Sequence, residues 1–146
     1  MISVLIVDDH ILIREVIKTF LETTPDIQVV ATAENGIEAV TATRQHRPDV
    51  VIMDISMPHM DGLEATRQIL NDFPYTRVVM LSSHDNPVYI RNALEAGAKG
   101  YVVKDAMTSE LLEAIRSLYH GRRYFSHQIA DAVNQYIDED SDIWAD

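Results

Sequence analysis

The chain has no cysteine among its 146 residues, so disulfide bonds, thiolate catalysis and cysteine-ligated metal sites are excluded. No apolar run approaches the ~20 residues that a helix needs to cross a bilayer. The opening apolar stretch spans only about six residues and has no basic flank, unlike a signal peptide. We therefore expect a cytoplasmic protein that does not contact a membrane.

Basic residues are also scarce. The chain has 12 lysines and arginines against 23 acidic residues, which gives a formal net charge of −11. Five of the acids lie within positions 138–146, and the rest of the chain is still acidic without them. Because this charge repels a polyanion on average, we do not expect these residues alone to bind DNA.

The residues that are present predict one globular domain of the α/β class. Hydrophobic residues make up 47% of the chain, and five short apolar runs alternate with five helix-like stretches. The runs lie at 3–7, 27–33, 50–53, 77–82 and 100–103. Polar residues interrupt the second run, which is therefore expected at an edge of the sheet. Strict alternation predicts a doubly wound (βα)5 flavodoxin-like fold, with a parallel five-stranded sheet in the order 2-1-3-4-5 and helices on both faces.

The helix-like stretches carry residues that typically mark helix ends. Asp61 and Asn86 are expected as N-caps, and Pro87 suits the first position of a helix. Gly97 is expected as a C-cap. Another helix is predicted over 36–46, which follows an Asn-Gly pair and stops before a proline.

The first and last helices define the expected limits of the domain. Two rows of apolar residues predict one buried stripe on the first helix, namely Leu12, Val16 and Phe20 with Ile13, Ile17 and Leu21. The fifth helix should begin near Thr108 and end at Gly121. Residues 1–121 are therefore the predicted domain, and 122–146 are expected to be a linker with a short helix over 126–137 and an acidic tail. The sequence leaves open whether this segment folds back onto the domain.

Polar side chains stand where four of the predicted strands end. Asp8 and Asp9 end the first strand, Asp54 the third, Ser82 the fourth and Lys104 the fifth. Each has an ordinary alternative reading: a helix cap, a turn hydroxyl or a solvated lysine. The carboxyl ends of parallel strands meet at one edge of the sheet, where ligands of this fold class sit. Taken together, these residues predict a site for a divalent cation and a phosphoryl group.

Five motifs in this order carry a resemblance to a known family: Asp8-Asp9, Met53-Asp54-Ile-Ser-Met-Pro58, Met60-Asp61-Gly62, Leu81-Ser82 and Gly100-Tyr-Val-Val-Lys104. Over about residues 2–121 the chain resembles the receiver domain of bacterial response regulators (CheY-like). The stretches 96–101 and 121–126 resemble the NarL/LuxR-type subgroup. Asp105 follows the lysine at a position where many receivers have proline.

The resemblance implies that Asp54 is phosphorylated, by the phosphohistidine of a sensor histidine kinase or by a small donor such as acetyl phosphate. Mg²⁺ would be held by Asp9 and Asp54, by Asp8 largely through water, and by the backbone carbonyl of Ser56. The ion and Lys104 would offset the repulsion between an anionic nucleophile and an anionic donor. The protein would not be a turnover enzyme.

The resemblance also assigns a switch. The Ser82 hydroxyl would donate a hydrogen bond to phosphorylated Asp54, and the Tyr101 ring would turn from exposed to buried. This event would bias the surface formed by the fourth helix, the fifth strand and the fifth helix. Ser56 and His84 would flank the path of the hydrolytic water and tune the lifetime of the phosphoryl group.

The sequence is compatible with three functions. The first is a receiver from a transcriptional regulator, which dimerises on phosphorylation and binds DNA through a C-terminal helix-turn-helix that these residues do not include. The second is a stand-alone receiver that docks to a protein partner. The third is a phosphatase of the haloacid dehalogenase kind, which needs an Asp-x-Asp pattern that neither strand end supplies. The dimer face is left open between helices one and five and the helix four/strand five surface.

Overall fold

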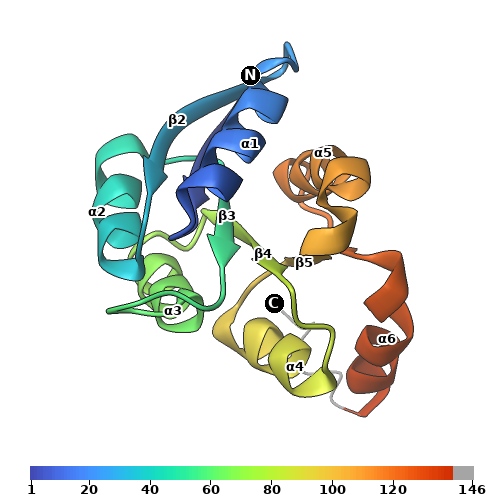
Figure 1. The fold of residues 1–146 in the computed structure, drawn as a ribbon. Coiled ribbons are helices and arrows are strands. Elements are labelled where there is room, and N and C mark those ends of the chain that lie inside the picture. Colours follow the sequence, from blue (N-terminus) through green and yellow to red (C-terminus); the bar gives the residue numbers. More distant parts are fainter. Residues whose placement is uncertain (140–146) are drawn as a thin grey trace.

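A six-stranded parallel sheet with helices on both faces forms the protein (Figure 1). The computed structural model describes residues 1–139. The strands are β1 Ile2–Val7, β2 Ile27–Ala33, β3 Val50–Asp54, β4 Arg77–Ser82, β5 Gly100–Val103 and β6 Tyr124–Phe125. Their order is β2-β1-β3-β4-β5-β6, which confirms the expected order of the first five and the edge position of β2.

Within residues 1–139, six α-helices connect or follow these strands. They are α1 Ile11–Glu22, α2 Gly36–His46, α3 Gly62–Asp72, α4 Pro87–Ala96, α5 Met107–Tyr119 and α6 Ala130–Glu139. The expected caps are confirmed: Asp61 accepts a hydrogen bond from the Glu64 amide, Asn86 accepts one from the Val88 amide, and Gly97 ends α4 with φ 104°. Within residues 1–139, no helix is long and apolar enough to span a membrane.

Two apolar layers cover the sheet because successive strand residues face opposite sides. Leu5 and Val7 of β1 pack in the layer beneath α2, α3, α4 and α6, whereas Val4 and Ile6 pack in the layer beneath α1 and α5. Figure 1 shows α1 and α5 above the sheet, with α3 and α4 below it. Helices therefore cover both faces of the sheet. Polar side chains stand at its carboxyl edge, where the strands end.

The buried stripe predicted for α1 is only partly correct. Ile17 and Leu21 are buried, and Ile13 and Phe20 are partly buried against the same apolar layer. Leu12 and Val16, however, are 76% and 49% exposed. Helix periodicity predicts which residues share a face but not how much of that face the sheet covers.

Residues 122–139 fold back onto the domain, which the sequence had left open. β6 pairs with β5 in parallel, and the Val103 amide donates a hydrogen bond to the Ser126 hydroxyl over 3.0 Å. Ile129 and Val133 are buried in the same apolar layer as α4. The helix expected over 126–137 is present as a short 3₁₀ turn, His127–Ile129, followed by α6. The expected acidic tail lies mostly outside the described residues.

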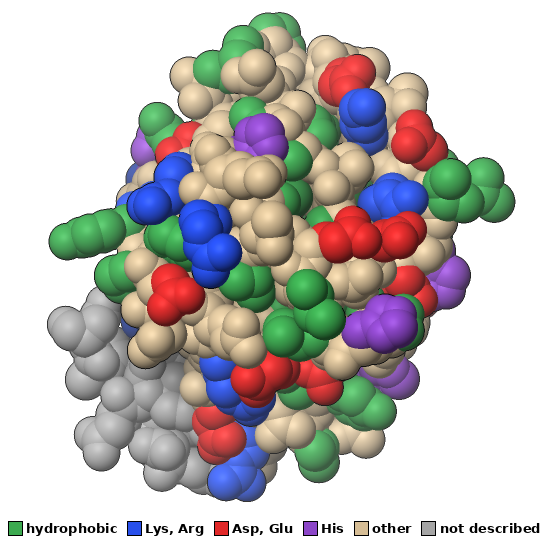
Figure 2. All heavy atoms as spheres, turned by 90° about the vertical axis from the view of Figure 1, so that its left-hand side faces the viewer, with side chains coloured by type: hydrophobic (Ala, Val, Ile, Leu, Met, Phe, Trp, Pro, Cys, Tyr) green, Lys and Arg blue, Asp and Glu red, His purple; other side chains and the backbone are tan. Residues whose placement is uncertain are grey.

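Charge of both signs is spread over the surface that Figure 2 shows. Lysine and arginine side chains are interspersed there with aspartate and glutamate side chains. The described residues on that face therefore form no extended basic surface of the kind that binds a polyanion.

Candidate functional site

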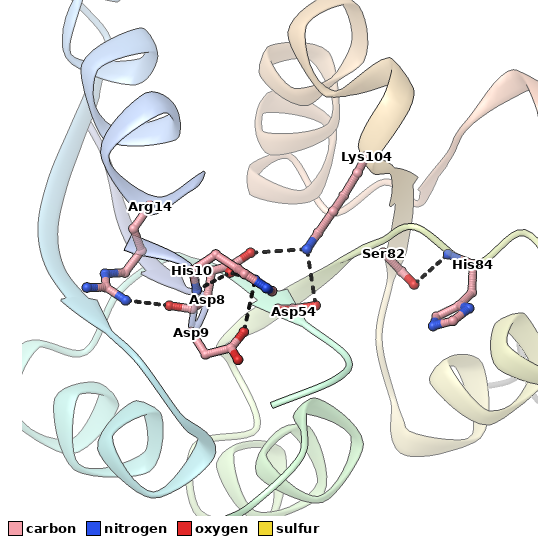
Figure 3. Close-up of polar contacts among 8 residues, drawn as sticks. All are labelled: Asp8, Asp9, His10, Arg14, Asp54, Ser82, His84 and Lys104. Atoms are coloured by element: carbon pink, nitrogen blue, oxygen red, sulfur yellow. Dashed lines mark hydrogen bonds and ion pairs between the residues drawn. The ribbon is translucent and has the colours of Figure 1, made fainter. Parts of the chain in front are cut away.

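Three charged side chains from three strands meet at the carboxyl edge of the sheet (Figure 3). Asp8 follows β1, Asp54 ends β3, and Lys104 follows β5. The Lys104 Nζ lies 3.3 Å from Asp8 Oδ2 and 3.6 Å from Asp54 Oδ1. β1 and β3 are hydrogen-bonded neighbours, which brings the two carboxylates close together. The sheet thus assembles the cluster of residues that the strand ends predicted.

Burial and charge perturb Asp54 strongly. The residue is 4% exposed, and this burial is the main reason why its pKa is raised to about 6. The nearby Asp8 raises the pKa of Asp54 further, while Lys104 and a backbone hydrogen bond from Ser56 lower it. A positive charge added among the carboxylates would therefore favour the ionised form of Asp54.

The backbone beneath Asp54 is held by a close glycine contact. The Gly62 amide at the start of α3 donates a hydrogen bond to the Ile55 carbonyl over 2.8 Å. A Cβ at Gly62 would overlap the Asp54 carbonyl oxygen, so a side chain cannot be accommodated without a shift of backbone. The Asp61-Gly62 pair therefore caps α3 and also sets the position of Asp54.

Sequence reasoning missed His10 and Arg14. The Nδ1 atom of His10 lies 3.0 Å from Asp8 Oδ1 and 3.1 Å from Asp9 Oδ1. Arg14 Nη1 donates a hydrogen bond to the Asp8 backbone carbonyl over 2.7 Å (Figure 3). The signal for His10 was its place directly after the two aspartates. Arg14 reaches the Asp8 carbonyl from the first turn of α1, and no residue pattern in the sequence predicts this contact.

Asp8 does not cap α1, which was the ordinary alternative offered for the acidic pair. The N-cap position of α1 is His10, and among residues 1–139 no side chain accepts a capping hydrogen bond there. The Oδ1 atom of Asp8 accepts a hydrogen bond from the His10 amide over 2.8 Å within the turn before the helix. Its Oδ2 faces Lys104 inside the cluster.

Ser82, His84 and Tyr101 form a second group beside the carboxylates. The Ser82 hydroxyl, buried at the end of β4, accepts a hydrogen bond from the His84 amide over 3.0 Å. The buried Tyr101 hydroxyl donates to the His84 carbonyl over 2.6 Å. The His84 ring stacks on Tyr89 with 4.0 Å between ring centroids. The two predicted switch residues both contact the backbone of His84. The Tyr101 ring is already buried, so the structure does not show the exposed position from which it was expected to turn.

The donor set fits a hard divalent cation. Asp8, Asp9, His10 and Asp54 each offer one ligand atom, and these atoms lie within 4.8 Å of one another. Among residues 1–139, Asp54 Oδ2 is buried with no hydrogen-bond partner. Oxygen-rich sites of this kind suit Mg²⁺ and its retained waters. Ser56, whose carbonyl was also expected as a ligand, is an exposed residue of the loop that follows β3.

Comparisons with known proteins agree on the family. Residues 4–116 match the family described as response regulator receiver domain. The chain is 43% identical over 133 residues to response regulator GacA of Pseudomonas syringae pv. syringae, which covers 91% of this chain and 62% of that protein. It is 38% identical over 137 residues to oxygen regulatory protein NreC of Staphylococcus carnosus, covering 92% of this chain and 63% of that protein. The chain thus spans about three fifths of the length of these relatives.

Solved structures give the same assignment. A LuxR-family two-component response regulator from Aurantimonas sp. SI85-9A1 superposes with a TM-score of 0.88 and 35% identity, covering 93% of this chain and 97% of that one. The signal receiver domain of NarL from Mycobacterium tuberculosis superposes with a TM-score of 0.79 and 34% identity, covering 83% and 98%. The chain belongs to the response regulator receiver family of phosphorylation-activated two-component signalling, and within it to the NarL/LuxR type.

Proposed function

We propose that Asp54 is the residue that accepts the phosphoryl group. The observation that carries this proposal is the Lys104 ammonium, which lies 3.6 Å from Asp54 and 3.3 Å from Asp8. An Asp54 oxygen attacks phosphorus as the P–N bond of a phosphohistidine, or the P–O bond of acetyl phosphate, breaks. Lys104 offsets the charge on the transferred group, which is most of what phosphoryl transfer requires.

Mg²⁺ is the proposed metal of this cluster. Asp9, Asp54 and the Ser56 carbonyl would hold it, with Asp8 acting largely through water. When bound, the ion neutralises charge on the phosphoryl oxygens. The fit is supported by the buried Asp54 oxygen that lacks a hydrogen-bond partner among residues 1–139 and by the raised pKa of Asp54.

Ser82 and Tyr101 are the proposed output of the site. Phosphorylated Asp54 would accept a hydrogen bond from the Ser82 hydroxyl, which now accepts one from the His84 amide. This hydroxyl can do both, because it is a donor as well as an acceptor. Through His84 the change reaches Tyr101 and the surface of α4, β5 and α5. Ser56 and His84 would tune the lifetime of the phosphoryl group.

The proposed partners follow from the family. A sensor histidine kinase supplies the phosphoryl group, and phosphorylation favours a homodimer. We also propose that the whole protein regulates transcription through a LuxR-type helix-turn-helix, because the chain matches only about three fifths of its longer relatives, among them transcriptional regulatory protein DegU of Brevibacillus brevis. The receiver itself would be a phosphorylated switch and not a turnover enzyme.

The test is the intact mass of the protein after incubation with acetyl phosphate and Mg²⁺. The wild type should gain one phosphoryl group, and Asp54→Asn should gain none. Beryllofluoride, which mimics the phosphoryl group without transfer, is the second probe. Labelling of the Asp54→Asn variant would move the site elsewhere, and absence of labelling in the wild type together with no response to beryllofluoride would contradict the proposal.

A further inference from the structure

The imidazole of His10 is directed into the acidic cluster. Its Nδ1 lies 3.0 Å from an oxygen of Asp8 and 3.1 Å from an oxygen of Asp9 (Figure 3). The His10 side chain is 63% exposed, so apolar packing does not explain its position. The polar contacts of the 8–10 turn do explain it.

Two hydrogen bonds hold this turn in place. Arg14 Nη1 binds the Asp8 carbonyl, and the His10 amide binds the Asp8 side chain. The first contact ties the turn to α1, and the second directs the His10 backbone toward the cluster. The ring nitrogen therefore reaches the two carboxylates from a backbone that is already ordered.

The separations match those between ligands of one metal ion. Two ligand atoms at right angles, each about 2.1 Å from an ion, are about 3.0 Å apart. The His10 nitrogen stands at this distance from both aspartates, and in the metal-free protein its contact with Asp8 is a hydrogen bond that a bound ion would replace. All four donor atoms of Asp8, Asp9, His10 and Asp54 lie within 4.8 Å of one another. One ion could contact the nitrogen and three carboxylates if these atoms moved inward.

A nitrogen donor changes which metal the cluster prefers. Mg²⁺ takes oxygen ligands and water, whereas an imidazole nitrogen suits first-row transition metals. Asp54 Oδ2 is buried without a hydrogen-bond partner in the described part of the chain, which indicates a ligand on its side of the cluster, as it does for the proposed metal site. The geometry points to His10 as a direct nitrogen ligand for a transition-metal dication, in addition to the carboxylates that bind Mg²⁺. This inference rests on the proposed metal site.

Electron spin echo spectroscopy of bound Mn²⁺ tests the nitrogen directly. The wild-type complex should show modulation from a coordinated ¹⁴N, and His10→Gln should lose it while still binding Mn²⁺. His59→Gln is the matched control, because His59 lines a shallow cavity of about 250 Å³ with Asp9 but lies outside the four-donor set. A ¹⁴N signal that survives in His10→Gln, or disappears in His59→Gln, would overturn the inference.

Calorimetry with Co²⁺ and Mg²⁺ measures which of the two ions the site binds more tightly. In His10→Gln the Co²⁺ affinity should fall about tenfold or more, while the Mg²⁺ affinity stays nearly unchanged. Equal losses for the two ions, or none, would contradict a nitrogen ligand. Asp9→Asn separates the two proposals: if it weakens both ions while His10→Gln weakens neither, the metal site stands and the role of His10 falls. If neither variant weakens either ion, the metal site itself is wrong.

Discussion

The Tyr101 hydroxyl donates a hydrogen bond to the backbone carbonyl of His84, with 2.6 Å between the two oxygens. Tyr101 lies in β5 and is fully buried, whereas His84 lies in the loop between β4 and α4. Burial raises the pKa of Tyr101 to about 12, so its hydroxyl remains a donor at neutral pH. The amide of the same His84 binds Ser82. A displacement of Ser82 therefore reaches the Tyr101 ring through one residue.

Tyr101→Phe should loosen this loop. The change leaves the His84 carbonyl without its donor and should cost about 1 kcal/mol of unfolding free energy. Hydrogen exchange of the amides in 83–86 should become faster, while phosphorylation of Asp54 should persist. Tyr119→Phe, at a partly exposed tyrosine, is the control. Unchanged exchange in 83–86 would show that the hydroxyl does not hold the loop.

Asp54→Asn should stabilise the metal-free protein at neutral pH. The pKa of Asp54 is raised from 3.8 to about 6, so between these values the native state holds a proton that the unfolded state releases. The wild type therefore loses stability as pH rises through this window. Asparagine does not titrate, and the variant should be more stable above pH 6 by up to about 3 kcal/mol.

Urea unfolding in EDTA at several pH values measures this difference. The curves of wild type and variant should converge toward pH 4 and diverge toward pH 7. Asp72→Asn, at an exposed position at the end of α3, should show no such divergence. A constant difference between wild type and Asp54→Asn across the range would refute the raised pKa.

Lys104→Met should have the opposite effect on stability. Lys104 is 20% exposed and faces two buried carboxylates, so its loss should cost about 2 kcal/mol at pH 7. Because Lys104 lowers the pKa of Asp54, the variant should raise that pKa further and slow phosphorylation by acetyl phosphate. Lys99→Met, at the opposite end of β5, is the control. Equal stability and labelling rates in the two variants would contradict the assigned role.

Mg²⁺ should raise the melting temperature of the wild type. Binding to the native state alone adds about 1.4 kcal/mol when the free ion is ten times its dissociation constant. Asp9→Asn should reduce the shift, since it removes one carboxylate of the cluster. A differential scanning experiment at millimolar Mg²⁺ is sufficient. The assigned ligands would be wrong if the ion produced no shift in the wild type.

Gly62→Ala should disturb the site through the backbone. The new Cβ would overlap the Asp54 carbonyl oxygen, so the loop after β3 must move, at a cost of about 2 kcal/mol or more. Gly121→Ala is an informative contrast, because Gly121 has φ +80° and nothing within 4 Å of its Cβ position. That variant should cost only the backbone strain, about 1 kcal/mol. Similar losses of phosphorylation in both variants would argue against a specific contact.

Local residue patterns were sufficient to predict the positions of most strands of the sheet. Apolar runs and helix caps depend on residues close together in the chain, and these placed β1 to β5 and the caps Asp61 and Asn86 close to their observed positions. β6 escaped prediction because it is two residues long and depends on pairing with β5. The exposure of Leu12 and Val16 on α1 was not predicted, because helix periodicity does not reveal how much of the helix the sheet covers.

The sequence by itself determined which charged groups reach the carboxyl edge of the sheet, because strand ends in a parallel sheet share one edge. Asp8, Asp54 and Lys104 follow from that rule alone. Only the tertiary structure decided how their neighbours turn: the His10 ring toward two aspartates, the Tyr101 hydroxyl toward His84, and the Gly62 backbone against Asp54. The Tyr101 and Gly62 contacts join separate elements of the fold, and packing sets the distances between such elements while periodicity does not. The His10 contacts join near neighbours in the chain, but the residue pattern does not encode the direction of the ring.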